Sequence, residues 1–251
     1  LTMNIHILSL LGVATIAQVS TAMAQTAPKV NILFCVADDA GHMSAYGVPW
    51  INTPAFDTVA RNGLLFNNMY TCNAKSAPSR AAMITGRNWQ LEEACNHWPN
   101  FPEKFKSYPE TLADNGYYVG CTGKGWGPGY AVNSRGENRN LTGQVWNKRK
   151  LTPPTTGISD YDYAANFNDF LKSWDKSKPF CFWYGALEPH RGYEYESSKR
   201  FGKNINDIDS VPSYWPDNEV VRRDMLDYAV EVEHFDKHLG LILQSLEEIG
   251  E

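Results

Sequence analysis

The chain has 251 residues, of which 43% are hydrophobic and 20% are charged, so it can bury a large core and is not expected to be disordered. Its formal net charge is −5 at pH 7, which gives no electrostatic reason to expect nucleic acid as a partner. The size fits one domain, or most of one, and any anionic ligand must be held by local positive groups.

The first residues have the pattern of an export signal. Over residues 3–24, an apolar run precedes a small-x-small cleavage site, Ala22-Met23-Ala24. The run is too short to span a membrane comfortably, and no cysteine follows it to carry a lipid anchor. We therefore expect upstream residues and a signal peptide over 1–24, a folded domain over 25–251, and a periplasmic or secreted location without a membrane anchor.

Strands and helices are predicted to alternate along the domain. The apolar run 30–37 ends abruptly in Asp38 and Asp39, which predicts a buried parallel strand with two carboxylates at its carboxyl end. A helix is predicted to start at Pro54, followed by a strand over 64–70. Further strands are expected over 117–122 and 179–185, and further helices over 110–115, 161–174 and 219–249.

This order of elements predicts an α/β fold with a largely parallel sheet flanked by helices. The last helix carries Gly240, where a break is an open alternative. Residues 125–157 are rich in Gly, Asn, Pro and Arg and show little periodicity, so we expect an irregular insertion of the kind that recognises substrates. The chain ends just after a helix, where a further strand would be expected, so the domain is predicted to be truncated.

One short motif combines a hydroxyl, a proline and an arginine. Ser76 is followed by Pro78, Arg80 and a short apolar run that ends in Thr85-Gly86. Pro78 suits the first turn of a helix, because its φ is fixed and its missing N–H would be unpaired there anyway. The first-turn N–H groups would then favour an anion over Ser76. Spacing alone leaves an ordinary helix start and a nucleophile at a helix mouth about equally open.

The order Ser-x-Pro-x-Arg and then Thr-Gly resembles the signature of type I sulfatases, in which a Cys or Ser is oxidised to formylglycine. The matching residue is Ser76, and the resemblance extends over nearly everything after about Lys29. It implies an alkaline-phosphatase-like α/β fold. A serine at this position implies a bacterial, serine-type formylglycine maturation enzyme as a partner.

The resemblance also assigns a metal site. Asp38 and Asp39 match the paired metal-binding aspartates of the family, with Ser76 beside them, and hard carboxylate oxygens suit Ca²⁺. Taken alone, two aspartates after a strand are more typical of a helix cap or turn. Arg80 falls one turn after Ser76, where it could hold the hydrated aldehyde and balance local negative charge.

Other matches concern the sulfate. Lys124 and His190 match family residues that contact it, and the pKa range of a histidine suits proton donation to a leaving group. Arg191 is expected to bind substrate. The family places a histidine two residues after the lysine, whereas this chain has Trp126, so either another group takes that role or Trp126 belongs to an altered substrate pocket. Further metal ligands in the second half of the family cannot be matched here.

The segment Glu188-Pro189-His190-Arg191 and the later stretch 211–224 resemble the heparan N-sulfatase (sulfamidase) branch. This implies a sulfuric ester or sulfamate hydrolase that removes sulfate from a sulfated sugar or glycosaminoglycan. Two alternatives stay open. One is a phosphate or phosphonate ester hydrolase that uses unmodified Ser76, and the other is a non-catalytic protein that binds sulfated glycans.

Overall fold

The computed structural model describes residues 29–87 and 100–251. The predicted signal peptide, within residues 1–24, lies outside them. The chain divides into two units, Leu1–Val30 and Asn31–Glu251, and the second contains all the helices and strands of the described residues. Within those residues, no helix is both long and apolar enough to cross a bilayer.

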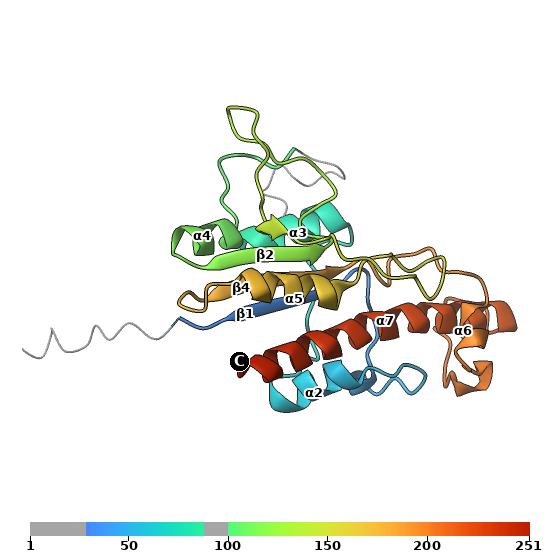
Figure 1. The fold of residues 1–251 in the computed structure, drawn as a ribbon. Helices are drawn as coiled ribbons and strands as arrows, with labels where there is room; N and C mark the ends of the chain where they lie inside the picture. Colours follow the sequence, from blue (N-terminus) through green and yellow to red (C-terminus); the bar gives the residue numbers. More distant parts are fainter. Residues whose placement is uncertain (1–28, 88–99) are drawn as a thin grey trace, which may run out of the picture. The chain divides into compact units, whose positions relative to one another are not determined.

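The second unit is built on a parallel sheet with the strand order β1-β4-β2-β3 (Figure 1). The strands are β1 (Ile32–Ala37), β2 (Tyr118–Gly123), β3 (Gln144–Val145) and β4 (Phe180–Ala186). This confirms the predicted α/β fold with a parallel sheet. Because all strands run the same way, their carboxyl ends lie at one edge, where α/β proteins place their sites.

Helices cover both faces of the sheet, and the side-chain alternation of β4 shows how. Phe182 and Tyr184 pack towards α5 (Tyr163–Ser173) and α7 (Glu219–Ile249). Trp183, which points the other way, packs with residues of α3 (Ser76–Thr85) in a second apolar cluster. A central strand buried on both faces therefore reads as a continuous apolar run.

The remaining helices lie around these layers. They are α2 (Pro54–Asn62), which packs along α7, α4 (Tyr108–Asp114), which packs on β2, and the short α6 (Ser197–Arg200) beside α7. Two 3₁₀ turns, η1 (Ser44–Tyr46) and η3 (Ile205–Asp207), lie in the connections.

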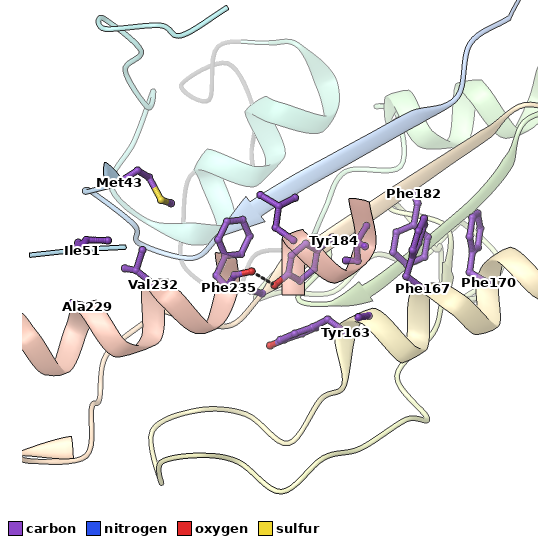
Figure 2. Close-up of a cluster of buried hydrophobic side chains, with 14 of the residues drawn as sticks. Met43, Ile51, Tyr163, Phe167, Phe170, Phe182, Tyr184, Ala229, Val232 and Phe235 are labelled. Carbon is purple, nitrogen blue, oxygen red and sulfur yellow. Dashed lines mark hydrogen bonds between the residues drawn. The ribbon is translucent and has the colours of Figure 1, made fainter. Parts of the chain in front are cut away.

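Aromatic rings fill the larger core (Figure 2). The ring centroid of Phe182 lies 4.8 Å from that of Phe167 and 4.6 Å from that of Phe170. Tyr184 stacks on Phe235 at 5.2 Å and donates a hydrogen bond of 3.1 Å to its carbonyl. Burying each such ring contributes about 1.5–3 kcal/mol, so these contacts hold α5 and α7 against the sheet.

Most predicted elements are confirmed, with two changes in the helices. The last helix runs unbroken through Gly240, and it begins after Asn218, whose side chain accepts a hydrogen bond from the N–H of Val221. The helix expected over 110–115 begins earlier, at Tyr108. A capping box fixes that start, because the Ser107 side chain accepts from the N–H of Glu110 and the Glu110 carboxylate accepts from the N–H of Ser107.

The strand expected over 64–70 is wrong. The structure has no strand there, and the side chains of Leu64, Met69 and Tyr70 are all more than four-fifths exposed. A strand needs a neighbour for its backbone N–H and C=O groups, and no strand of the described residues pairs with this segment. The insertion at 125–157 is irregular apart from the two residues of β3 and isolated bridges, as predicted.

Candidate active site

The Ser76 hydroxyl lies at the start of a helix. Ser76 is the first residue of α3, and Lys75 before it has an extended backbone. Pro78 lies in the first turn, and Gly86 ends the helix in the left-handed conformation, with φ of 65°. Both positions confirm the predicted helix. Since the first N–H groups of a helix have no partner within it, the positive end of α3 faces the Ser76 side chain.

Asp38 binds both candidate cations of the site. It follows β1, and its N–H donates to the carbonyl of Glu188 after β4 at 2.9 Å. Its carboxylate is only 6% exposed and lies 3.0 Å from Arg80 Nη2 and 2.5 Å from Lys124 Nζ. Burial alone would raise the pKa of Asp38, but hydrogen bonds and charges from Lys124 and Arg80 outweigh it and hold that pKa below its usual value. Asp38 is therefore ionised at neutral pH.

Arg80 ties α3 to the strand ends. Its side chain is 2% exposed, and Nη1 donates to the carbonyls of Lys124 at 3.2 Å and Gly125 at 2.8 Å. The guanidinium carbon lies 5.9 Å from the ring centre of Trp183 in β4. Because its charge and most of its donors are satisfied inside the protein, Arg80 fixes the start of α3 beside Asp38.

The ammonium group of Lys124 lies beside the Ser76 hydroxyl. Its Nζ donates to Ser76 Oγ at 2.9 Å, and Ser76 Oγ lies 3.5 Å from Asp38 Oδ1. Two glycines let β2 and β4 approach closely here. An added Cβ on Gly185 would lie 1.9 Å from the Lys124 carbonyl oxygen, and one on Gly123, where φ is 73°, would lie 2.0 Å from the Gly185 oxygen. The four predicted residues Asp38, Ser76, Arg80 and Lys124 thus form one group.

His190 lies nearer the second aspartate. Its Nε2 is 3.8 Å from Asp39 Oδ2, and its Nδ1 is 2.7 Å from the carbonyl oxygen of Arg191. Both side chains are more than half exposed. Asp39 has a left-handed backbone with φ of 66°, which is uncommon for a residue other than glycine. In the described part of the chain, no hydrogen bond joins His190 to Ser76.

The two remaining predicted residues occupy different places. Arg191 makes a two-pronged ion pair with Asp224 of α7, at 2.9 and 2.5 Å, and its guanidinium carbon lies 5.0 Å from the ring centre of Tyr193. Trp126 packs edge-to-face against Phe101 at 5.2 Å in the second apolar cluster. Its ring is thus a packing group there, apart from the contacts of the Ser76 hydroxyl.

Sequence reasoning missed the role of Glu188 as a support. This carboxylate is fully buried and accepts hydrogen bonds of 2.7 Å from the N–H of Ser159 and from the hydroxyl of Tyr163. The same hydroxyl accepts from the N–H of Leu187 at 3.0 Å. Burial, with the Glu188 charge adding to it, raises the pKa of Tyr163, so its proton stays in place. One local signal of the contact between Glu188 and Tyr163 was present in the sequence, namely a charged residue close after an apolar strand.

The predicted metal ligands do not gather into a metal site among the described residues. Within residues 29–87 and 100–251, no group of three or more His, Cys, Asp or Glu side chains could hold a metal ion. Both oxygens of Asp38 are engaged by Arg80 and Lys124. Ca²⁺ takes six to eight oxygen ligands. Asp38, Asp39 and Ser76 therefore do not make a Ca²⁺ site by themselves.

The fold and the site together define a class of protein. It is a parallel α/β domain in which a hydroxyl at a helix N-terminus is grouped with two cations and a buried carboxylate at the strand ends, an arrangement suited to holding an anionic group. The model of the sulfatase family matches residues 30–251, and the chain belongs to that family.

Curated relatives agree with this. The chain is 29% identical over 197 residues to the N-acetylglucosamine-6-O-sulfatase of Bacteroides thetaiotaomicron, covering 73% of this chain and 35% of that protein. It is 27% identical over 264 residues to the human N-sulphoglucosamine sulphohydrolase, covering 88% and 47%. The similarity to the latter supports the sulfamidase-like branch. The chain spans about a third to a half of the length of these relatives.

Solved structures show the fold. A protein solved in complex with its substrate D-glucosamine-2-N,6-O-disulfate superposes with a TM-score of 0.61 at 20% identity, over 89% of this chain and 63% of that one. The phosphonate monoester hydrolase of Agrobacterium radiobacter gives a TM-score of 0.57 at 17% identity, over 88% and 60%. The expected alkaline-phosphatase-like sulfatase fold is thereby confirmed.

Proposed function

We propose that this chain carries the nucleophile and part of the sulfate site of a sulfuric ester or sulfamate hydrolase, which removes sulfate from a sulfated sugar or glycosaminoglycan. One observation carries the proposal: Ser76 Oγ lies at the N-terminus of α3, 2.9 Å from the Lys124 ammonium. The relatives support the substrate class, because their names specify sulfated amino sugars.

The residues of the chain would divide the work between them. A sulfate over Ser76 would meet the first-turn N–H groups of α3 and the Lys124 ammonium, which stabilise charge on its oxygens. Asp38 holds Lys124 and Arg80 in position, so the positive groups need no rearrangement when the anion binds. His190 has its Nδ1 against a carbonyl oxygen, which places a proton on Nδ1 and leaves Nε2 to exchange a proton with the leaving atom.

Two groups that the family implies belong to this proposal. Formylglycine, made from Ser76 by a serine-type maturation enzyme, supplies a hydrated aldehyde whose second hydroxyl gives sulfate a way to leave that a plain serine lacks. Asp39 would contribute carboxylate oxygens to Ca²⁺, Asp38 would do so only by giving up a contact with Arg80 or Lys124, and further ligands would come from outside the described residues. Export to the periplasm or the medium is likewise proposed, on the pattern of residues 3–24.

Mass spectrometry tests the first step. The protein is expressed with a serine-type maturation enzyme and digested with trypsin, which releases the peptide Ser76–Arg80. Loss of two hydrogens at Ser76 supports the proposal, and release of sulfate from a sulfated amino sugar by the matured protein supports the activity. Ser79, in the same peptide, is the internal control and should keep its mass. An unmodified Ser76, with the enzyme active on a control peptide, contradicts the proposal.

A second candidate function has its own observation. The Lys124 ammonium, 2.9 Å from Ser76 Oγ, would also favour the alkoxide of an unmodified serine, as a phosphate or phosphonate ester hydrolase requires. Hydrolysis of a phosphate ester by protein with intact Ser76 would support that reading. Metal-independent binding of sulfated glycans without turnover would instead support the non-catalytic alternative, to which the Trp126 substitution points.

A further inference from the structure

A hollow of about 690 Å³ opens beside the site, between the segment after β1 and the start of α7. Its volume falls within the range of about 300–1,000 Å³ that is typical of ligand pockets. Asp39 and Arg191, both predicted site residues, form part of its wall. Asp39 in this wall directly follows Asp38, which belongs to the group around Ser76.

Aromatic rings make the floor of this hollow. The ring of Tyr228 lies 6.4 Å from that of Trp50 and 6.0 Å from that of Tyr193, measured between centroids. The Tyr228 hydroxyl accepts hydrogen bonds from the N–H groups of Gly41 at 2.8 Å and His42 at 3.2 Å. These bonds connect α7 to the segment after β1, so the floor is fixed before a ligand arrives.

A loop with two exposed rings also lines the hollow. Tyr214 is 80% exposed and Trp215 is 57% exposed, although both are large and apolar, and both line the hollow. Their centroids are 6.1 Å apart at an angle of 55°. Aromatic faces exposed in a polar-rimmed pocket suit a ligand that has apolar C–H faces and hydroxyl edges, as a pyranose ring does.

The charged side chains that line the hollow limit which ligands can bind there. Three carboxylates, Asp39, Asp209 and Asp224, line the hollow against one guanidinium, Arg191. Arg191 is already paired with both oxygens of Asp224. Asp209 is exposed and makes no hydrogen bond or ion pair with any described residue. Even if Asp39 is assigned to the sulfate site, the rest of the wall carries a net negative charge.

We propose that this hollow, lined by Trp50, Tyr214 and Trp215, is a subsite for a pyranose unit that is neutral or bears an amine, and that it rejects uronates and sugars carrying a second sulfate. The inference rests on the proposed function for the position of the scissile sulfate at Ser76. Rings stack on the sugar, Asp209 accepts from its hydroxyl or ammonium groups, and the carboxylates repel an anion.

Binding of unsulfated sugars to the full chain tests the subsite without any turnover. Saturation-transfer NMR with N-acetylglucosamine, glucosamine and glucuronate should show the first two bound, glucosamine the more tightly because its ammonium meets the Asp209 carboxylate, and glucuronate at least tenfold weaker. Trp215→Ala should weaken binding at least tenfold, and Asp209→Asn should abolish the preference for glucosamine over N-acetylglucosamine. Tyr70→Ala, which removes a ring that is 83% exposed and does not line the hollow, is the matched control and should change nothing.

The outcomes separate the two proposals. Equal binding of glucuronate and glucosamine, or unchanged binding in the Trp215→Ala variant, overturns the subsite even if Ser76 is converted to formylglycine. Sugar binding with the expected preference, in a protein whose Ser76 is never converted, supports the subsite and contradicts the proposed catalytic function. Circular dichroism of each variant shows that the loss of binding is not a loss of folding.

Discussion

The Asp38→Asn substitution tests how the site is held together. It keeps the shape of the side chain but removes the negative charge that pairs with Arg80 and Lys124. Arg80 is 2% exposed, so its charge would stay buried with only carbonyl oxygens as partners, whereas Lys124, at 21% exposed, can turn to water. Breaking a buried pair costs about 3–5 kcal/mol. Because Lys124 can escape, we expect about 3 kcal/mol.

The stability that Asp38 contributes depends on pH, and the direction of its pKa shift fixes the sign of that dependence. The pKa of Asp38 is lower in the folded protein than in the unfolded chain, so its contribution to stability is present above the unfolded pKa, about 3.9, and is lost as the pH falls through the folded value. Urea unfolding followed by tryptophan fluorescence should therefore show Asp38→Asn about 3 kcal/mol less stable at pH 7. The gap between the two proteins should shrink below about pH 4.

A matched control separates this from a general charge effect. Asp217 also pairs with an arginine, Arg222, but that carboxylate is 55% exposed, so Asp217→Asn should change stability little. The reasoning is refuted if Asp38→Asn unfolds like the wild type at pH 7, or if the difference between them stays constant down to pH 3.

Two further predictions concern close packing and a buried acid. Gly185→Ala places a Cβ 1.9 Å from the Lys124 carbonyl oxygen and should cost about 1–3 kcal/mol in urea unfolding. Gly240→Ala in α7, where the nearest atom would be at 3.5 Å, should instead gain up to about 1 kcal/mol. Equal effects of the two substitutions would contradict the close approach of the strands. Burial, with the Glu188 charge adding to it, raises the pKa of Glu231 to about 8. Wild-type stability should therefore fall as the pH rises from the unfolded pKa, about 4.3, through 8 and level off above it, and Glu231→Gln should flatten that decline; an unchanged slope would show that Glu231 titrates normally.

The elements that were predicted correctly are those whose pattern lies within one continuous stretch of the sequence. The apolar run before Asp38 identified β1, and amphipathic spacing identified α7 over its full length, where Asn218 and Gly250 cap its two ends. The strand expected over 64–70 failed because strand formation depends on a partner. Apolar content says nothing about whether a neighbouring strand is available, and none of the described strands pairs with that segment.

Some features of the site could likewise be predicted from the sequence, and others could not. The motif placed Ser76 at the start of a helix, and the family resemblance selected Lys124, a lysine that would otherwise read as solvated surface. The link that unites them through Asp38 could not be read locally, because it joins residues 38, 80 and 124 from three separate elements. The anchoring of Glu188 by Tyr163 is of the same non-local kind.

The distribution of charge around the strand ends gives the site a direction. Near Ser76, Arg80 and Lys124 outnumber the Asp38 carboxylate, and the positive end of α3 adds to them, although the chain as a whole carries −5. In the hollow beyond Asp39, carboxylates outnumber the single guanidinium. A ligand with one anionic end and a neutral or amine-bearing ring would be favoured with the anion over Ser76, because the reverse orientation places the anion against the carboxylates of the hollow and, for an amine-bearing ring, the ammonium against Arg80 and Lys124. Such a field would present the sulfated end of a sugar to the nucleophile before any contact specific to the ring is made.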